Sequence, residues 1–262
     1  MYAKNTWEKY KDNLNEVMEY NEGYKDYISK NKTERACVKD SIRLAKEKGF
    51  KPLDSFETLK PGDKVYVNNR DKNIALFVIG NKPLTEGMRI LGAHIDSPRM
   101  DLKQNPIYES EGFVLADTHY YGGVKKYQWV TIPLSLYGVI AKKDGTVVDV
   151  VIGEDDNDPV VGISDLLIHL AAEQLDKKAA KVIEGENLDV TLGSMPLVGE
   201  EKDAVKANIL KLLKDKYDIE EEDFVSAEIE VVPSGKARDY GLDRSMIAGY
   251  GLSLIHISEP TR

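Results

Sequence analysis

The stretch Gly92-Ala93-His94-Ile95-Asp96-Ser97-Pro98 decides the fold assignment, because a histidine and an aspartate follow an apolar run at a spacing of two residues. Residues 88–93 predict a short buried strand, and residues 74–79 predict its neighbour. In an extended backbone residues i and i+2 point to one face, so we expect Asp96 to lie beside His94. This arrangement suits a metal-bound imidazole held by a carboxylate. A purely structural His–Asp pair at a strand end is the alternative.

Several stretches further along the chain follow this one in a specific order. They are His94 to Lys103, Tyr120-Tyr121-Gly122-Gly123 with Tyr127-Gln128-Trp129, Ile163 to Leu170, and Gly235 to Met246. Together they resemble the M18 family of metalloaminopeptidases, the aspartyl aminopeptidase family, and most closely its bacterial branch. The resemblance extends from near the N-terminus to Gly251.

The predicted fold class is α/β. Helical patterns followed by strands over residues 1–105 are typical of the opening of an α/β domain, and residues 106–234 have the pattern of a separate α+β module. The resemblance implies the N-terminal part of a zinc-peptidase α/β/α sandwich (1–105), an inserted α+β dimerisation domain (106–234) and the start of a second catalytic segment (235–251). A homo-oligomer formed through residues 106–234 is therefore expected.

The resemblance also implies a site. His94 would be a zinc ligand, and Asp96 would act in the catalytic centre by orienting it. The family's bridging aspartate is expected just after a Tyr-Gly such as Tyr250-Gly251, and its glutamate pair, further aspartate and final histidine would follow. The full-length enzyme would hold two zinc ions and hydrolyse N-terminal residues, acidic ones among the candidates, from peptide substrates. One histidine cannot hold zinc tightly, so we expect the 262-residue chain itself to be inactive.

His169 has two interpretations. The predicted helix over residues 165–182 places it at the polar edge of an apolar face. The resemblance implies instead that it reaches the active site of a partner subunit and binds substrate there, which would make dimerisation a requirement for activity.

Residues 252–262 do not resemble natural protein sequence. Read back into codons, Leu252-Ser253-Leu254-Ile255-His256-Ile257-Ser258-Glu259-Pro260-Thr261-Arg262 matches the transposase end and adapter of DNA sequencing libraries. We expect a non-native tail here, and a protein that is a fragment of a longer one.

Periodicity predicts the remaining elements. Helices are expected over residues 7–28, with an apolar stripe packed in the core, over 33–49 with Thr33 as its cap, and over 203–216. Strands are expected over 64–67, over 128–140 and 146–152, which a hairpin turn at Lys143-Asp144-Gly145 would connect, and over a half-exposed 227–232. We expect a structural loop around His119, a solvated acidic turn over 154–158, and local pairing of Lys236, Arg238 and Arg244 with Asp239 and Asp243.

Composition narrows the function classes. The chain is 42% hydrophobic and 31% charged with a net charge of −9, which disfavours nucleic-acid partners. No apolar run is long enough to cross a membrane, and Cys37 is the only cysteine, so we expect a reduced, cytoplasmic setting. A non-catalytic assembly module, or another dinuclear zinc hydrolase such as a carboxypeptidase or deacylase, are the alternative functions.

Overall fold

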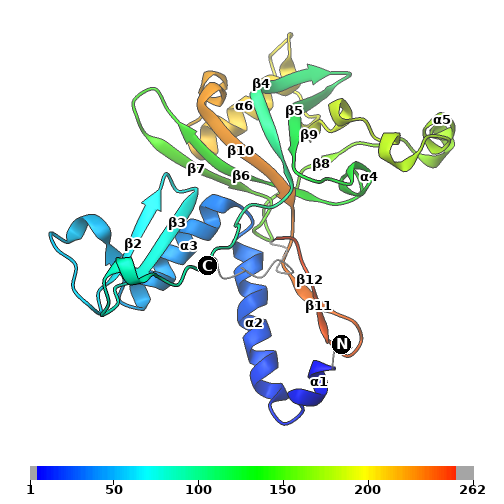
Figure 1. Ribbon diagram of the computed structural model, residues 1–262. Helices are drawn as coiled ribbons and strands as arrows, with labels where there is room; N and C mark the ends of the chain where they lie inside the picture. Colours follow the sequence, from blue (N-terminus) through cyan, green and yellow to red (C-terminus); the bar gives the residue numbers. More distant parts are fainter. Residues whose placement is uncertain (1–4, 252–262) are drawn as a thin grey trace. The chain divides into compact units, whose positions relative to one another are not determined.

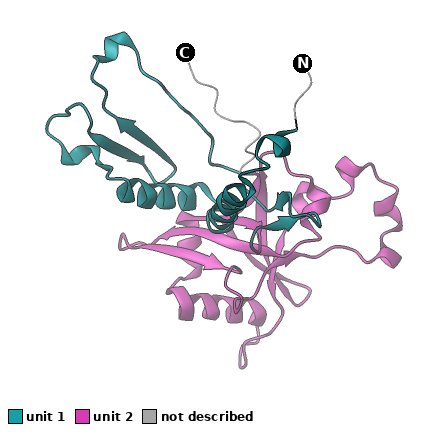
Figure 2. Ribbon diagram, turned by 90° about the horizontal axis from the view of Figure 1, so that it is seen from below, with its two compact units in different colours: residues 1–97, 236–262 teal, residues 98–235 magenta. Residues whose placement is uncertain are grey.

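The computed structural model describes residues 5–251 and divides into two compact units, residues 1–97 with 236–262 (unit 1) and residues 98–235 (unit 2) (Figures 1 and 2). The limit expected after residue 105 falls within strand β4 (Arg99–Ser110), which pairs with β5 (Phe113–Tyr121) on both sides of that limit. A paired strand belongs to one sheet along its length. The boundary between the two units therefore lies at Pro98. The catalytic and dimerisation roles assigned to the domains stay predictions.

Unit 1 begins with helices α1 (Thr6–Lys9), α2 (Leu14–Lys30) and α3 (Glu34–Glu47). The Thr33 side chain accepts a hydrogen bond from the Ala36 amide at 3.3 Å and caps α3, as its sequence predicts. The expected long helix is interrupted at residues 10–13. The prediction that its apolar stripe packs in the core is confirmed for Ile28, which is buried, and wrong for Trp7, which is 41% exposed. The interruption separates the two halves of the stripe, so only the second half packs.

The sheet of unit 1 has the order β1-β2-β3, formed by β1 (Lys51–Pro52), β2 (Lys64–Asn69) and β3 (Asn73–Val78). β1 and β2 run parallel, and β2 and β3 run antiparallel. The strand expected over residues 88–93 is wrong. A single turn of 3-10 helix at Leu84–Glu86 is followed by one bridge residue, Ile90, and the chain from 91 to 97 is irregular. Leu91 is 80% exposed, so this apolar run lacks the packing that stabilises a buried strand.

Unit 2 is built on a seven-stranded antiparallel sheet of order β7-β6-β10-β4-β5-β9-β8. Its other strands are β6 (Leu134–Ala141), β7 (Val147–Ile152), β8 (Gly162–Ile163), β9 (Val190–Gly193) and β10 (Ala227–Pro233). The predicted β7 and the turn at Gly145, with φ of 87°, are confirmed. The strand expected from residue 128 begins only at Leu134, because a short helix α4 (Lys126–Trp129) precedes it.

β10 is an interior strand of this sheet, between β6 and β4. Four of its residues are buried, so the prediction of a half-exposed strand is wrong. Glu230 is only 2% exposed. Gly138 on β6 allows β10 to approach closely, since a Cβ there would lie 1.9 Å from the Glu228 carbonyl oxygen.

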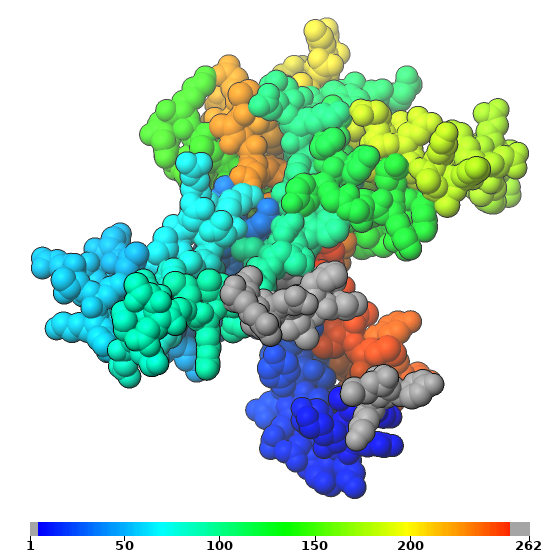
Figure 3. All heavy atoms as spheres, in the orientation of Figure 1, coloured from blue at the N-terminus to red at the C-terminus, as the bar shows by residue number. Residues whose placement is uncertain are grey.

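Helix α6 (Ala204–Tyr217) is confirmed and lies against this sheet, followed by 3-10 helix at Glu221–Ser226. The helix expected over residues 165–182 is wrong. That segment holds only α5 (Ala172–Leu175) and single 3-10 turns at Ile168–Leu170 and Ala179–Lys181, with another at Gly185–Asn187. It extends away from the sheet of unit 2, in yellow-green in Figures 1 and 3. Its large apolar side chains, among them Leu167 and Leu175, are exposed, and short helices without packing are marginal.

The core of unit 2 lies on the two sides of the central strands. Its fully buried side chains include Met100, Val114, Leu134, Ile140, Leu188, Val190, Ile219, Val231 and Val232. Within residues 5–251 there is no helix with the length and apolar character that crossing a membrane requires.

Candidate functional site

His94 and Asp96 lie together in the irregular chain that follows the sheet of unit 1. The His94 Nδ1 atom is 3.0 Å from the backbone oxygen of Asp96 and 3.4 Å from its carboxylate oxygen Oδ1. The expected proximity is therefore present, although a loop produces it and the backbone carbonyl is the nearer group. Both side chains are accessible, at 44% and 37% exposure.

This contact determines the tautomer of the imidazole. A carbonyl oxygen can only accept a hydrogen bond, so Nδ1 must carry the proton in the Asp96 contact. The neutral ring then has its lone pair on Nε2, which is the form that a metal ion requires. In this neutral tautomer the loop leaves Nε2 of His94 available to a metal ion.

The donor set is incomplete for zinc. A catalytic zinc site takes three protein ligands, and two zinc ions require a bridging carboxylate in addition. Among residues 5–251 no group of three or more His, Cys, Asp or Glu side chains is arranged to hold a metal ion. The residues that the structure describes therefore do not form a complete zinc centre, and His256 lies outside them.

The segment that carries Tyr250-Gly251 is anchored to helix α2. It contains the hairpin of β11 (Arg238–Tyr240) and β12 (Met246–Ala248). The Lys25 ammonium lies 2.5 Å from Asp239, which raises the pKa of Lys25, and the Ala237 amide donates to the Ser29 hydroxyl at 2.9 Å. These contacts join the start of the chain and its last described residues within unit 1.

The predicted local pairing of the basic cluster is confirmed for one member. Arg244 Nη1 is 3.7 Å from Asp239, while hydrogen bonds from the side chain and the amide of Ser245 lower the pKa of the Asp243 carboxyl. The acidic turn over residues 154–158 is also used structurally. Asp158 accepts from the Gly153 amide and pairs with Lys216 at 3.0 Å.

The other two described histidines lie in unit 2. His169 is exposed in the 3-10 turn Ile168–Leu170. His119 belongs to strand β5 opposite Asp101 and stacks on Tyr120, so the loop expected around it is wrong. The tight turn follows instead at Gly122, whose φ is 76° and where a Cβ would lie 3.5 Å from Pro98.

A buried ionic cluster directly after the His94 loop was not predicted. Arg99 Nε is 2.8 Å from Asp101 Oδ1 and 3.3 Å from Glu230 Oε2, and its guanidinium lies over the Tyr121 ring. The available signal was the pair Arg99 and Asp101, which share one face of β4. The partner on β10 was hidden, because only strand order brings Glu230 beside them.

The chain matches the model of the aminopeptidase I zinc metalloprotease family, M18, over residues 27–254. The chain belongs to the M18 family. It is 61% identical over 254 residues to a probable M18 family aminopeptidase 1 of Clostridium acetobutylicum, an alignment that covers 95% of this chain and 55% of that protein. This M18 chain thus spans about half the length of the curated relatives it matches.

Solved structures agree with the fold of this M18 chain. The crystal structure of an M18 aminopeptidase from Thermotoga maritima matches with a TM-score of 0.88 and 47% identity, covering 94% of this chain and 54% of that one. The structure of aminopeptidase I from Clostridium acetobutylicum matches with a TM-score of 0.83 and 59% identity, over 94% and 56% of the two chains. The resemblance and the α/β fold class inferred from the sequence are therefore confirmed.

Proposed function

We propose that this chain is part of a zinc-dependent aminopeptidase that removes N-terminal residues, acidic ones among the candidates, from peptides with a pair of zinc ions. The observation that carries the proposal is the His94 loop, because its Nδ1 contact selects the neutral tautomer that has the lone pair on Nε2. Membership of a family described as zinc metalloproteases supports the metal. In the complete site His94 would bind one zinc ion, and Asp96 would orient the imidazole.

We propose further that the 262-residue chain does not hydrolyse peptides. Bound zinc would activate water and polarise the scissile carbonyl, and this needs ligands and a general base beyond the two groups of the His94 loop. Release of 4-nitroaniline from aspartyl, glutamyl and leucyl anilides, with zinc added, should stay at the buffer rate. Hydrolysis that a chelator abolishes would contradict this proposal.

The full site is tested by sequencing the source gene across the codon of Gly251 and expressing the continuous reading frame. We expect an aspartate soon after Gly251, a later glutamate pair, chelator-sensitive aminopeptidase activity, and loss of that activity in His94→Ala. His119→Ala is the matched control, since that histidine is exposed on strand β5. Blocked N-termini as substrates separate this activity from a carboxypeptidase or deacylase, which would cleave them.

The inserted module is proposed to form a homo-oligomer through residues 106–234, with His169 reaching the substrate of a partner subunit. The support is the segment around His169, in which Leu167, Ile168 and Leu170 are at least 66% exposed. The same observation favours the second candidate, a non-catalytic assembly module. We propose a cytoplasmic setting because the lone Cys37 is buried as a free thiol.

Mass measurement by light scattering on the whole chain tests the oligomer. Leu167→Asp should convert it to a monomer, while Leu242→Asp, at a fully exposed leucine of unit 1, should leave the mass unchanged. A monomeric parent chain would remove both the oligomer and the assembly module. In the extended enzyme, His169→Ala should then raise KM more than it lowers kcat.

A further inference from the structure

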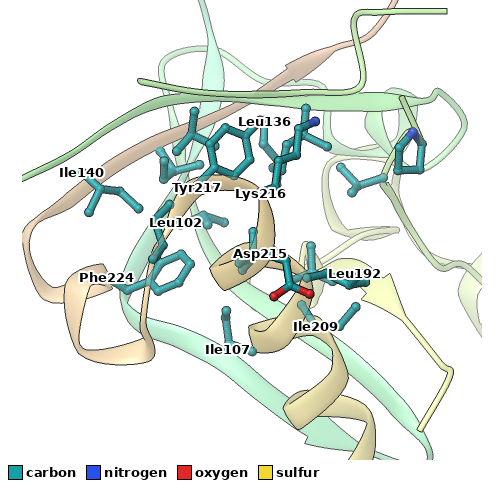
Figure 4. Close-up of a pocket in the computed structure, with 18 of the residues that line it drawn as sticks. Leu102, Ile107, Leu136, Ile140, Leu192, Ile209, Asp215, Lys216, Tyr217 and Phe224 are labelled. Carbon is teal, nitrogen blue, oxygen red and sulfur yellow. The ribbon is translucent and has the colours of Figure 1, made fainter. Parts of the chain in front are cut away.

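Unit 2 contains an apolar cavity of about 470 Å³ between helix α6 and the sheet (Figure 4). Strands β4, β6, β7, β9 and β10 form its floor, and α6 with the following 3-10 helix forms its roof. The lining is almost entirely aliphatic or aromatic, as Leu102, Ile107, Leu136, Ile140, Ile209 and Phe224 show. Its volume lies within the range of about 300–1,000 Å³ that is usual for small-molecule sites.

The cavity is held open because polar contacts fix both ends of α6. At the first turn, the Glu109 carboxylate accepts hydrogen bonds from the backbone amides of Val205 and Lys206, at 3.0 and 2.9 Å. At the last turn, the Tyr217 hydroxyl donates to the Val151 carbonyl oxygen at 2.6 Å, and Lys142 contacts Asp218. The middle of the helix cannot approach the sheet without breaking these contacts.

The packing of α6 reflects this restraint. Val205, near the fixed first turn, is 5% exposed, whereas Ile209 and Leu213 farther along the same face are only half-buried. At the edge of the cavity Leu212 and Val160 are 55% and 53% exposed. These two apolar side chains mark an opening from solvent.

The polar groups of the lining define the chemistry of a ligand, because each has a partner within the protein. Asp215 accepts from Lys211 at 2.5 Å, Lys216 pairs with Asp158 at 3.0 Å, and the Tyr217 hydroxyl is bonded to Val151. A charged or strongly polar ligand would lose its hydration without gaining a partner here. An apolar molecule gives up no hydrogen bonds to water when it enters the cavity.

We propose that this cavity is a binding site for a small, neutral, apolar molecule. The site lies wholly within unit 2 and is independent of the peptidase function and of the His94 loop. It requires neither zinc nor a partner subunit.

The test uses the intact chain and the neutral fluorophore N-phenyl-1-naphthylamine. We expect saturable binding of one molecule per chain, and an affinity at least about ten-fold lower for the anionic probe 8-anilinonaphthalene-1-sulfonate. Leu213→Trp fills the cavity and should weaken binding by about ten-fold or more. Leu175→Trp, at an exposed leucine of unit 2 outside the cavity, should bind like the parent. Equal affinity in the two tryptophan variants would overturn the proposal.

Methyl NMR of the unsubstituted chain provides a second measurement that does not depend on how Leu213→Trp folds. Chemical shift changes confined to accessible lining residues such as Leu102, Ile152 and Leu192 are expected. Changes centred on the exposed Leu166 to Leu170 segment, no binding at all, or binding that appears only as the chain self-associates would each overturn the site.

Discussion

The two units treat apolar sequence differently. In unit 2, the central strands have neighbours on both sides, and Leu134, Ile140 and Val231 are completely buried. In unit 1, the apolar run of β3 remains open to solvent, with Val78 64% exposed, and Leu91 beyond it is 80% exposed. Strand-like sequences of similar character therefore end in a core in one unit and on a surface in the other.

The difference shows that a strand forms and is buried because it has neighbouring strands to pair and pack with, and that the β-propensity of its residues is not sufficient. Unit 2 is an antiparallel sheet whose strands all come from residues 98–235, so its core is complete within that stretch. The apolar run at residues 88–93 would need neighbours that residues 5–251 do not provide. Its side chains, such as Leu91, therefore stay exposed to solvent.

Hydrogen exchange gives the largest expected contrast between the units. Amides of β6 and β10 should exchange at least about a hundred-fold more slowly than amides of residues 88–97, because the former open only with the whole sheet. Mass spectrometry of peptic fragments measures this. Equal protection in the two regions would mean that residues 88–97 are packed, and would remove the contrast.

Breaking the buried ion pair should destabilise unit 2 strongly. Arg99→Met removes the guanidinium that pairs with the Glu230 carboxylate, which is 2% exposed, and should cost about 3–5 kcal/mol of unfolding free energy. Urea unfolding followed by fluorescence of the buried Trp129 reports on this unit.

Two further variants sharpen that result. Adding Glu230→Met to Arg99→Met should restore much of the loss, because no buried charge then remains. Arg244→Met, at an arginine of unit 1 that is 72% exposed, should change stability by less than about 1 kcal/mol. If Arg99→Met lowered the free energy of unfolding no more than Arg244→Met does, the buried pair would not be important for stability.

A smaller loss is expected from Gly138→Ala. The new Cβ would meet the Glu228 carbonyl oxygen at 1.9 Å, forcing β6 and β10 apart at a cost of about 2–3 kcal/mol. Gly162→Ala is the matched control, because its Cβ has no neighbour within 4 Å. Equal urea midpoints for the two variants would show that the sheet adjusts there.

The smallest effect concerns alkaline pH. Burial and the hydrogen bond to Asp189 raise the pKa of Tyr108 from 10 to about 12. The folded state therefore keeps this proton where the unfolded state loses it, so stability falls as pH rises from about 10 to 12. Tyr108→Phe should have a shallower decline over this range than the parent. Tyr20→Phe, at an exposed tyrosine, should decline like the parent.

Local patterns predicted what local interactions stabilise. The Thr33 cap, the Gly145 turn and helix α6 each depend on residues close in sequence, and all are present. The helix over residues 165–182 failed because its apolar face lacks a partner within the described chain. The charges of β10 suggested exposure, whereas Arg99 and the neighbouring strands make its burial possible.

The sequence by itself determined the family and the fold class, because both depend on motifs and patterns in a fixed order along the chain. It also predicted that Asp96 lies near His94, although an irregular loop and not a strand brings the two together. Only the tertiary structure decided which carbonyl holds the imidazole, which strands surround Glu230, and the cavity beneath α6. These depend on strand order and on contacts between residues far apart in the chain. Periodicity describes one segment at a time and cannot specify such neighbours.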